Sequence, residues 1–157
     1  MHTILYLGPT TDLGYERELL GEWGKRSVHI ATCATLHATQ QLAATGTDGP
    51  QAAGVLAPDP LRDVSAIVVE QGELTTEDLR THPGLTVVVL LNDQTAHVDI
   101  AAATAENIWV TRAENRSLFS RFRRNSDAPG KSARRHALQD ALAGMSGERP
   151  SGRVNEL

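Results

Sequence analysis

Cysteine and aromatic residues are scarce in this chain of 157 residues, and each scarcity excludes a class of protein. The single cysteine, Cys33, has no second cysteine to pair with, which excludes an internal disulfide framework and fits a reducing cytoplasm. Aromatics are 4% of the residues, so a core must come from Leu, Val, Ile and Ala. No apolar run reaches the ~18–20 residues of a membrane span, and the N-terminus lacks the pattern of a signal peptide. We therefore expect a cytoplasmic protein.

Charge is distributed unevenly along the chain. Residues 1–111 carry a net charge of −9, residues 112–136 carry +6 and residues 137–157 carry −1. A basic segment on an acidic body indicates either a site for an acidic partner or a solvated helix face beside a linker. Nucleic acid is the weaker interpretation, because aromatic residues that stack on bases are scarce in the basic segment.

Five short apolar runs predict strands, at residues 3–7, 27–31, 66–69, 85–91 and 108–110. Leu85–Leu91 is apolar at every position except Thr86, which is typical of a parallel strand covered on both faces. Strands that alternate with helices predict a parallel sheet with right-handed crossovers. The expected fold class is therefore α/β, a flavodoxin-like five-stranded parallel sheet with helices on both faces.

Capping and breaker residues place the helices between these strands. Asp12 and Gly24 are expected to begin and end the first helix, and Thr35 to begin a second that runs to about Ala44. Residues 46–63 are rich in Gly, Pro and Asp and predict a loop. The remaining helices are expected to start near Thr75, to span Asp99–Ala105 and to span residues 132–143. The histidines expected at the surface or in turns are His2, His82 and His136.

Three stretches of the chain together resemble the D-isomer-specific 2-hydroxyacid dehydrogenase family. Val64–Leu91 is similar to that family's strand, short loop, T-x-E-x-L helix and next strand. His97–Thr111, which reads HVDIAAATAENIWVT, is similar to the segment that ends in the family's V-[TS] strand. Ala141–Glu156, which reads ALAGMSGERPSGRVNE, resembles the family's closing motif.

The resemblance implies one domain of a two-domain enzyme. In the family, an NAD-binding Rossmann domain is inserted after the V-[TS] strand, and the chain then returns to the substrate domain. Here only about twenty residues lie between Arg112 and Lys131, whereas a dinucleotide-binding βαβ unit needs ~30 residues with a Gly-rich turn. We therefore predict a flavodoxin-like domain at 1–111, an Arg/Ser-rich linker at 112–131 that replaces the NAD domain, and a C-terminal helix and tail at 132–157 that pack back on the same domain. No cofactor is expected, and no dehydrogenase activity from the chain alone.

The resemblance also implies a carboxylate pocket at the carboxyl ends of the strands. The family builds it from backbone N–H groups in the loops after strands three and four. In this chain the second loop reads LNDQTAH, where the family favours a Gly-rich turn, so the pocket departs from the family pattern. The substrate-binding candidates at this edge are Thr10, Gln71, Gly72, Asn92, Gln94 and Thr95.

The same edge carries acid–base candidates. Asp93, Glu73 and His97 are the predicted catalytic residues, although His97 alternatively fixes the loop rather than transferring protons. The spacing of four between His29, Cys33 and His37 is that of a zinc-binding helix face, but these residues fall on a strand, a turn and a helix. No metal site is therefore expected.

Two hypotheses of function remain open at this point. The first is a binding or accessory domain for a small organic acid, or for a partner protein that contacts residues 112–136. The alternative is a cofactor-independent enzyme of specialised metabolism, an isomerase, lyase or cyclase that works at the same edge. The sequence leaves the oligomeric state open.

Overall fold

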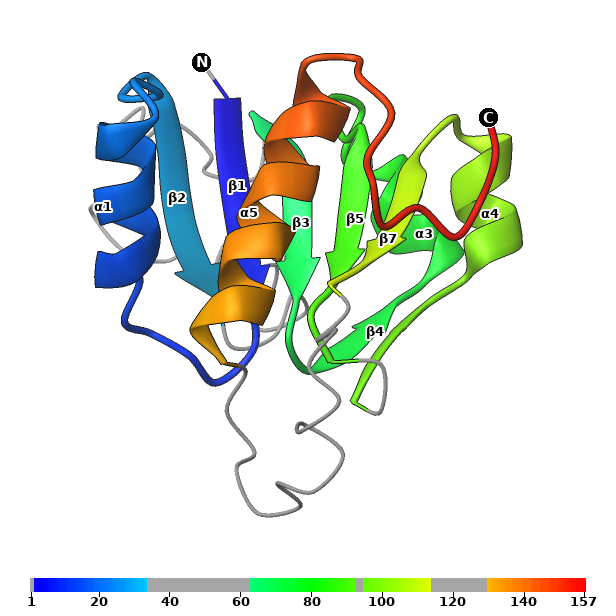
Figure 1. The fold of residues 1–157 in the computed structure, drawn as a ribbon. Helices are drawn as coiled ribbons and strands as arrows, with labels where there is room; N and C mark the ends of the chain where they lie inside the picture. The colour runs from blue at the N-terminus through cyan, green and yellow to red at the C-terminus, as the bar shows by residue number, and fades with distance from the viewer. Residues whose placement is uncertain (1, 34–62, 93–94, 114–129) are drawn as a thin grey trace, which may run out of the picture.

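The main sheet of the protein has five parallel strands in the order β2-β1-β3-β5-β7 (Figure 1). The computed structural model describes residues 2–33, 63–92, 95–113 and 130–157. This strand order is that of a flavodoxin-like fold, so the predicted fold class is confirmed. In sheet order the strands are Val28–Cys33, His2–Leu7, Val64–Val69, Val87–Leu90 and Trp109–Arg112.

Side chains of the central strands alternate between two apolar clusters, one on each face of the sheet. In β1, Ile4 and Tyr6 belong to one cluster, and Leu5 and Leu7 to the other. Helices complete both clusters, as predicted, because a parallel sheet buries both of its faces. The first face carries α1 (Gly14–Glu22) and α5 (Lys131–Met145), and the second carries α3 (Thr76–Arg80) and α4 (Ile100–Ala105).

The last helix, α5, packs directly on the middle of the main sheet. It contacts β3, β5 and β7 (Figure 1). Gly144 permits this close approach, since a Cβ atom at that position would lie 2.5 Å from the Cβ of Val87. Its Ala137, Leu138 and Ala141 are fully buried in the same cluster as α1.

The first helix begins one residue later than expected. Its N-cap is Leu13 rather than Asp12, because the Leu13 side chain is fully buried and fixes where the chain enters the helix. Asp12 instead accepts a hydrogen bond from the backbone N–H of Gly14 through Oδ1, at 2.9 Å. The helix ends at Glu22 with Trp23 as its C-cap, and the predicted stop, Gly24, follows with a φ of +68°, a conformation that suits glycine.

The caps of α3 and α4 follow the prediction. Thr75 and Asp78 form a reciprocal capping box at the start of α3. The Asp99 side chain caps α4 by accepting a hydrogen bond from the Ala102 N–H at 3.0 Å. His82, expected at the surface or in a turn, does follow α3 but is buried, and its Nδ1 lies 2.6 Å from the Asp78 carbonyl oxygen.

A second, small parallel sheet was not predicted. It pairs β4 (Gly72–Leu74) with β6 (Ala96–Val98), where loops were expected. Each strand has only three residues, too few to produce a clear alternating pattern. Leu74 is nonetheless fully buried and Val98 packs against the same cluster, so the small sheet is fixed by the core.

Several predicted segments lie outside the described residues. They include the helix that begins at Thr35, the loop at 46–63 apart from Asp63, and the linker at 112–131 apart from its ends. No helix within the part of the chain that the structure describes is long and apolar enough to cross a membrane.

Candidate functional site

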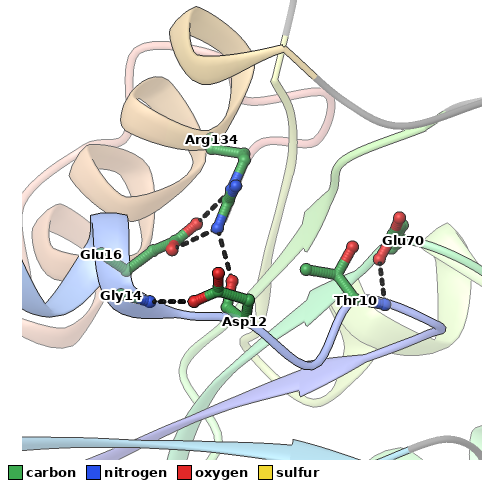
Figure 2. Close-up of polar contacts among 6 residues, drawn as sticks. All are labelled: Thr10, Asp12, Gly14, Glu16, Glu70 and Arg134. Carbon is green, nitrogen blue, oxygen red and sulfur yellow. Dashed lines mark hydrogen bonds and ion pairs between the residues drawn. The ribbon is translucent and has the colours of Figure 1, made fainter. Parts of the chain in front are cut away.

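The carboxyl ends of β1 and β3 form the polar edge of the main sheet, and Glu70 lies at its centre. Glu70 directly follows β3 and is 7% exposed. Its carboxylate Oε2 accepts a hydrogen bond from the backbone N–H of Thr10 at 3.0 Å (Figure 2). The predicted binding residue Thr10 therefore reaches this edge, where its amide is held by a carboxylate.

Gly8 brings the loop after β1 against Glu70. It has a φ of +148°, and a Cβ atom there would lie only 2.7 Å from the Cβ of Glu70. The position therefore requires glycine for its backbone conformation and for its close contact. The effect is to place a partly buried negative charge where the sequence resemblance implied a pocket for an acid.

The backbone amides of the predicted carboxylate pocket already have acceptors. Gln71 N–H donates to the Leu7 carbonyl at 3.3 Å, and Gly72 N–H donates to the Thr95 carbonyl at 2.9 Å. Thr95 N–H donates to the Asn92 carbonyl at 3.3 Å. The hydroxyl of Thr95 donates to the Glu70 carbonyl at 2.7 Å. These four donors therefore stabilise the loops themselves.

The small sheet brings two of the predicted catalytic residues together. Glu73 in β4 is the register partner of His97 in β6, so their side chains project from the same face of the parallel pair. Both residues are exposed. The ring of His97 makes no hydrogen bond to the other described residues. The other catalytic candidate, Asp93, and the binding candidate Gln94 lie outside the described residues.

An ion pair beside this edge joins α1 to α5. The guanidinium of Arg134 donates to both carboxylate oxygens of Glu16 at 2.6 Å, and to the backbone carbonyl of Asp12 at 2.8 Å (Figure 2). Glu16 is fully buried, while the Arg134 side chain is 19% exposed. The hydrogen bonds to Glu16 raise the pKa of Arg134 against the opposing effect of burial. Neither pattern nor spacing predicted the pair, since 118 residues separate its members.

Tyr6 lies close to this ion pair and has an unusual hydroxyl. The phenol oxygen is buried without a hydrogen-bond partner in the described structure. Burial, and then the negative charge of Glu16, raise the pKa of Tyr6 far above its ordinary value. Tyr6 therefore keeps its proton at neutral pH, and its ring packs in the apolar cluster that α1 and α5 cover.

Basic side chains of α5 cover two aromatic rings, Tyr15 in α1 and Trp23 at its C-cap. Lys131 Nζ and the Arg134 guanidinium carbon lie 5.5 and 5.6 Å from the centre of the Tyr15 ring. Arg135 lies 5.6 Å from the centre of the Trp23 ring. These are cation–π distances. Lys131 and Arg135 are exposed, so this face presents positive charge to solvent.

The N-terminus of α1 is unsuited to a phosphate group, and the described ranges contain no cluster of metal-ligating side chains. Phosphate groups bind at helix N-termini, but the carboxylate of Asp12 occupies the N-terminus of α1 and would repel them. No group of three or more His, Cys, Asp or Glu residues in the described ranges is placed to hold a metal. Three residues share the spacing of a zinc-binding helix face. His29 is exposed in β2, Cys33 is buried at the end of that strand, and His37 lies outside the described residues.

No model of a protein family matches the chain, and no curated protein matches it. Among solved structures, it is similar to an NAD-dependent formate dehydrogenase from Staphylococcus aureus, with 17% identity, 71% of this chain and 31% of that chain covered, and a TM-score of 0.44. A D-isomer specific 2-hydroxyacid dehydrogenase from Lactobacillus delbrueckii ssp. bulgaricus shares 13% identity over 73% of this chain and 30% of that chain, with a TM-score of 0.43.

A glyoxylate reductase from Paecilomyes thermophila shares 14% identity over 99% of this chain and 45% of that chain, with a TM-score of 0.43. This chain thus spans about a third of the first two proteins and less than half of the third. The enzyme activities named here belong to those three proteins. The fold assignment of this chain rests on its own strand order and register.

Proposed function

We propose that this chain is an accessory domain that binds a partner protein, and that it does not transfer hydride on its own. The observation that carries the proposal is the short connection between β7 and α5. Residues 113–130, eighteen in all, join these two elements of one sheet assembly. A dinucleotide-binding βαβ unit needs ~30 residues, so the place where the resembling family inserts its NAD domain has no room for one.

The hydrogen bonds already made at the sheet edge favour a protein partner over a free organic acid. An acid needs donors for its carboxylate, yet the amides of Gln71, Gly72 and Thr95 donate to carbonyls of the chain itself. Glu70 adds a negative charge at the same edge. Binding an acid there would break existing hydrogen bonds and bring like charges together.

The basic face of α5 supports an acidic partner. Lys131 and Arg135 are exposed above the rings of Tyr15 and Trp23 and belong to the segment 112–136, whose net charge is +6. Arginine and aromatic side chains are enriched in protein interfaces. This combination favours a partner surface that presents carboxylates.

A ligand screen tests the first half of the proposal. The melting temperature of the purified chain is measured with NAD, NADH and a panel of 2-hydroxy and 2-keto acids, together with NADH oxidation in the presence of each keto acid. We expect no saturable rise and no turnover. A ligand at 100 times its dissociation constant stabilises by about 2.7 kcal/mol, so a rise with NAD would overturn the proposal, and a rise with an acid alone would reassign the ligand.

Charge reversal tests the second half. A stoichiometric acidic protein that co-purifies with the wild-type chain at low salt is expected to be lost from the Arg135→Glu variant. The matched control is Arg80→Glu, an exposed arginine on α3 at the other face of the sheet. If the protein is lost from both variants, the change in net charge explains the loss, and a site on α5 is contradicted.

A second candidate function is a cofactor-independent acid–base enzyme, and the register of Glu73 with His97 favours it. If an isomerase, lyase or cyclase activity is found, Glu73→Gln and His97→Gln are each expected to lower kcat by about 10²–10⁴-fold, the contribution of general acid–base catalysis. Glu77→Gln, exposed on α3, is the control. Activity that survives both substitutions would remove these two residues from any mechanism.

A further inference from the structure

The outer edge of β7 is covered by the C-terminal tail rather than by another strand of the main sheet. The inner side of β7 pairs with β5, as the Trp109 N–H donation to the Thr86 carbonyl illustrates. On the outer side, the Arg112 N–H donates to the Gly152 carbonyl at 2.9 Å, and the Val154 N–H donates to the Val110 carbonyl at 2.7 Å. The tail thus runs antiparallel to β7 with the hydrogen bonds of an added strand.

Asn155 anchors this tail with its side chain. Its Oδ1 accepts the Val110 N–H at 2.8 Å, and its Nδ2 donates to the Ile108 carbonyl at 2.9 Å. Nδ2 also lies 2.9 Å from the Thr104 hydroxyl in α4. One amide side chain therefore satisfies two outward-facing backbone groups of the edge strand, which is why it is buried near the end of an exposed segment.

The other end of the tail is held by α5 and by a fit that only glycine allows. The buried carboxylate of Asp140 accepts hydrogen bonds from the N–H and the hydroxyl of Ser151, at 3.1 and 3.0 Å. A Cβ atom at Gly152 would lie 2.4 Å from the Arg112 carbonyl oxygen. The sequence of the tail is therefore specific for this edge.

Apolar burial contributes little within residues 151–157, whereas Pro150 just before them is buried. Val154 and Leu157 are 41% and 46% exposed, and Arg153 is also exposed. The tail is held mainly by hydrogen bonds to groups that would otherwise bond to water, and such bonds contribute about 0.5–1.5 kcal/mol each.

We propose that the outer edge of β7 is a strand-addition site, filled here by residues 151–155 of the same chain and able to accept the same segment from a second copy. Exposed strand edges bind extended segments through main-chain hydrogen bonds. The tail itself identifies the occupant, because it supplies the Asn155 amide and the glycine that this edge requires. A tethered tail has an effective concentration on the order of millimolar, so exchange between copies is expected once the intramolecular contact is weakened.

The test measures binding of a fluorescent peptide of residues 149–157 to the full chain by anisotropy. We expect the Asn155→Ala chain to bind it at least ten-fold more tightly than the wild-type chain, because its own tail competes less well. The peptide with Gly152→Ala is expected not to bind, since its Cβ would meet the Arg112 carbonyl. The peptide with Val154→Ala, altered at an exposed side chain, is the matched control and should bind like the original.

Circular dichroism verifies that each variant chain is folded. If the Asn155→Ala chain does not fold, the Ser151→Ala chain, which loses only a hydroxyl bond to Asp140, takes its place under the same criterion. A folded variant that binds the original peptide no better than the Gly152→Ala peptide would overturn the proposal. Binding that distinguishes the two peptides supports it.

Discussion

Tyr6 shows how a single buried polar atom influences stability. Its hydroxyl has no partner in the described structure, and leaving a buried hydroxyl unpaired costs about 1–3 kcal/mol. We expect Tyr6→Phe to leave the free energy of unfolding at pH 7 unchanged or to raise it by up to about 1–2 kcal/mol. Below the ordinary tyrosine pKa of about 10, the phenol is neutral in both states. Above it, the unfolded chain loses the proton and the folded chain keeps it, so wild-type stability falls as pH rises.

Urea unfolding at pH 7 and above pH 10 measures this effect. Tyr6→Phe should lose less stability between the two conditions than the wild type does. Tyr15→Phe is the control, because its half-buried ring contacts Lys131 and Arg134 at the surface. An equal alkaline loss in the two variants would contradict the assignment to Tyr6.

Capping at the start of α3 illustrates how one side chain fixes an element. This helix has five residues, too short to form without capping and packing. The Thr75 hydroxyl accepts the Asp78 N–H at 3.3 Å and donates to Oδ2 of Asp78 at 2.9 Å. Thr75→Ala is expected to cost about 1 kcal/mol in urea unfolding, whereas Thr75→Ser keeps the hydroxyl and should cost less than half as much. Equal losses would assign the effect to the methyl group.

At the scale of elements, sequence patterns were sufficient for the described elements that are long or capped. Leu85–Leu91 is apolar apart from Thr86, and it contains β5, whose four residues are all buried. The three-residue strands β4 and β6 carry too few residues for a pattern, so their pairing comes only from tertiary structure. For the same reason the edge position of Glu73 was predictable from strand order, whereas its register with His97 was not.

The candidate site was likewise predictable in its place and not in its contacts. Parallel strands end at one edge, so Thr10 and Gly72 were expected near each other. Which acceptor each backbone N–H finds depends on the geometry of the loops. That geometry cannot be read from the residues of the loop alone. The Glu70 carboxylate accepts the hydrogen bond of the Thr10 N–H, and backbone carbonyls accept those of the Gln71, Gly72 and Thr95 N–H groups.

At the scale of the molecule, the ion pair between Glu16 and Arg134 connects the first helix to the last. Glu16 is fully buried and Arg134 is partly exposed, so removing one partner is expected to cost more stability than removing the other. Arg134→Met leaves a fully buried carboxylate without its partner and is expected to cost about 3–5 kcal/mol. Glu16→Met leaves a guanidinium that already reaches solvent and should cost less. The double variant should be more stable than Arg134→Met alone, because it leaves no unpaired buried charge.

A double-mutant cycle in urea unfolding tests this asymmetry, with the exposed pair of Arg80 and Glu106 as control. Those side chains are 67% and 37% exposed, and exposed pairs couple by less than about 1 kcal/mol. If the Glu16–Arg134 coupling is as small as that of the control, α5 is held by its apolar face alone. A larger coupling means that the ion pair fixes α5 to α1. Loss of Arg134 is then expected to cost more stability than loss of Glu16. Such a contact constrains the position of Lys131 and Arg135, and hence of the basic face through which we propose the partner binds.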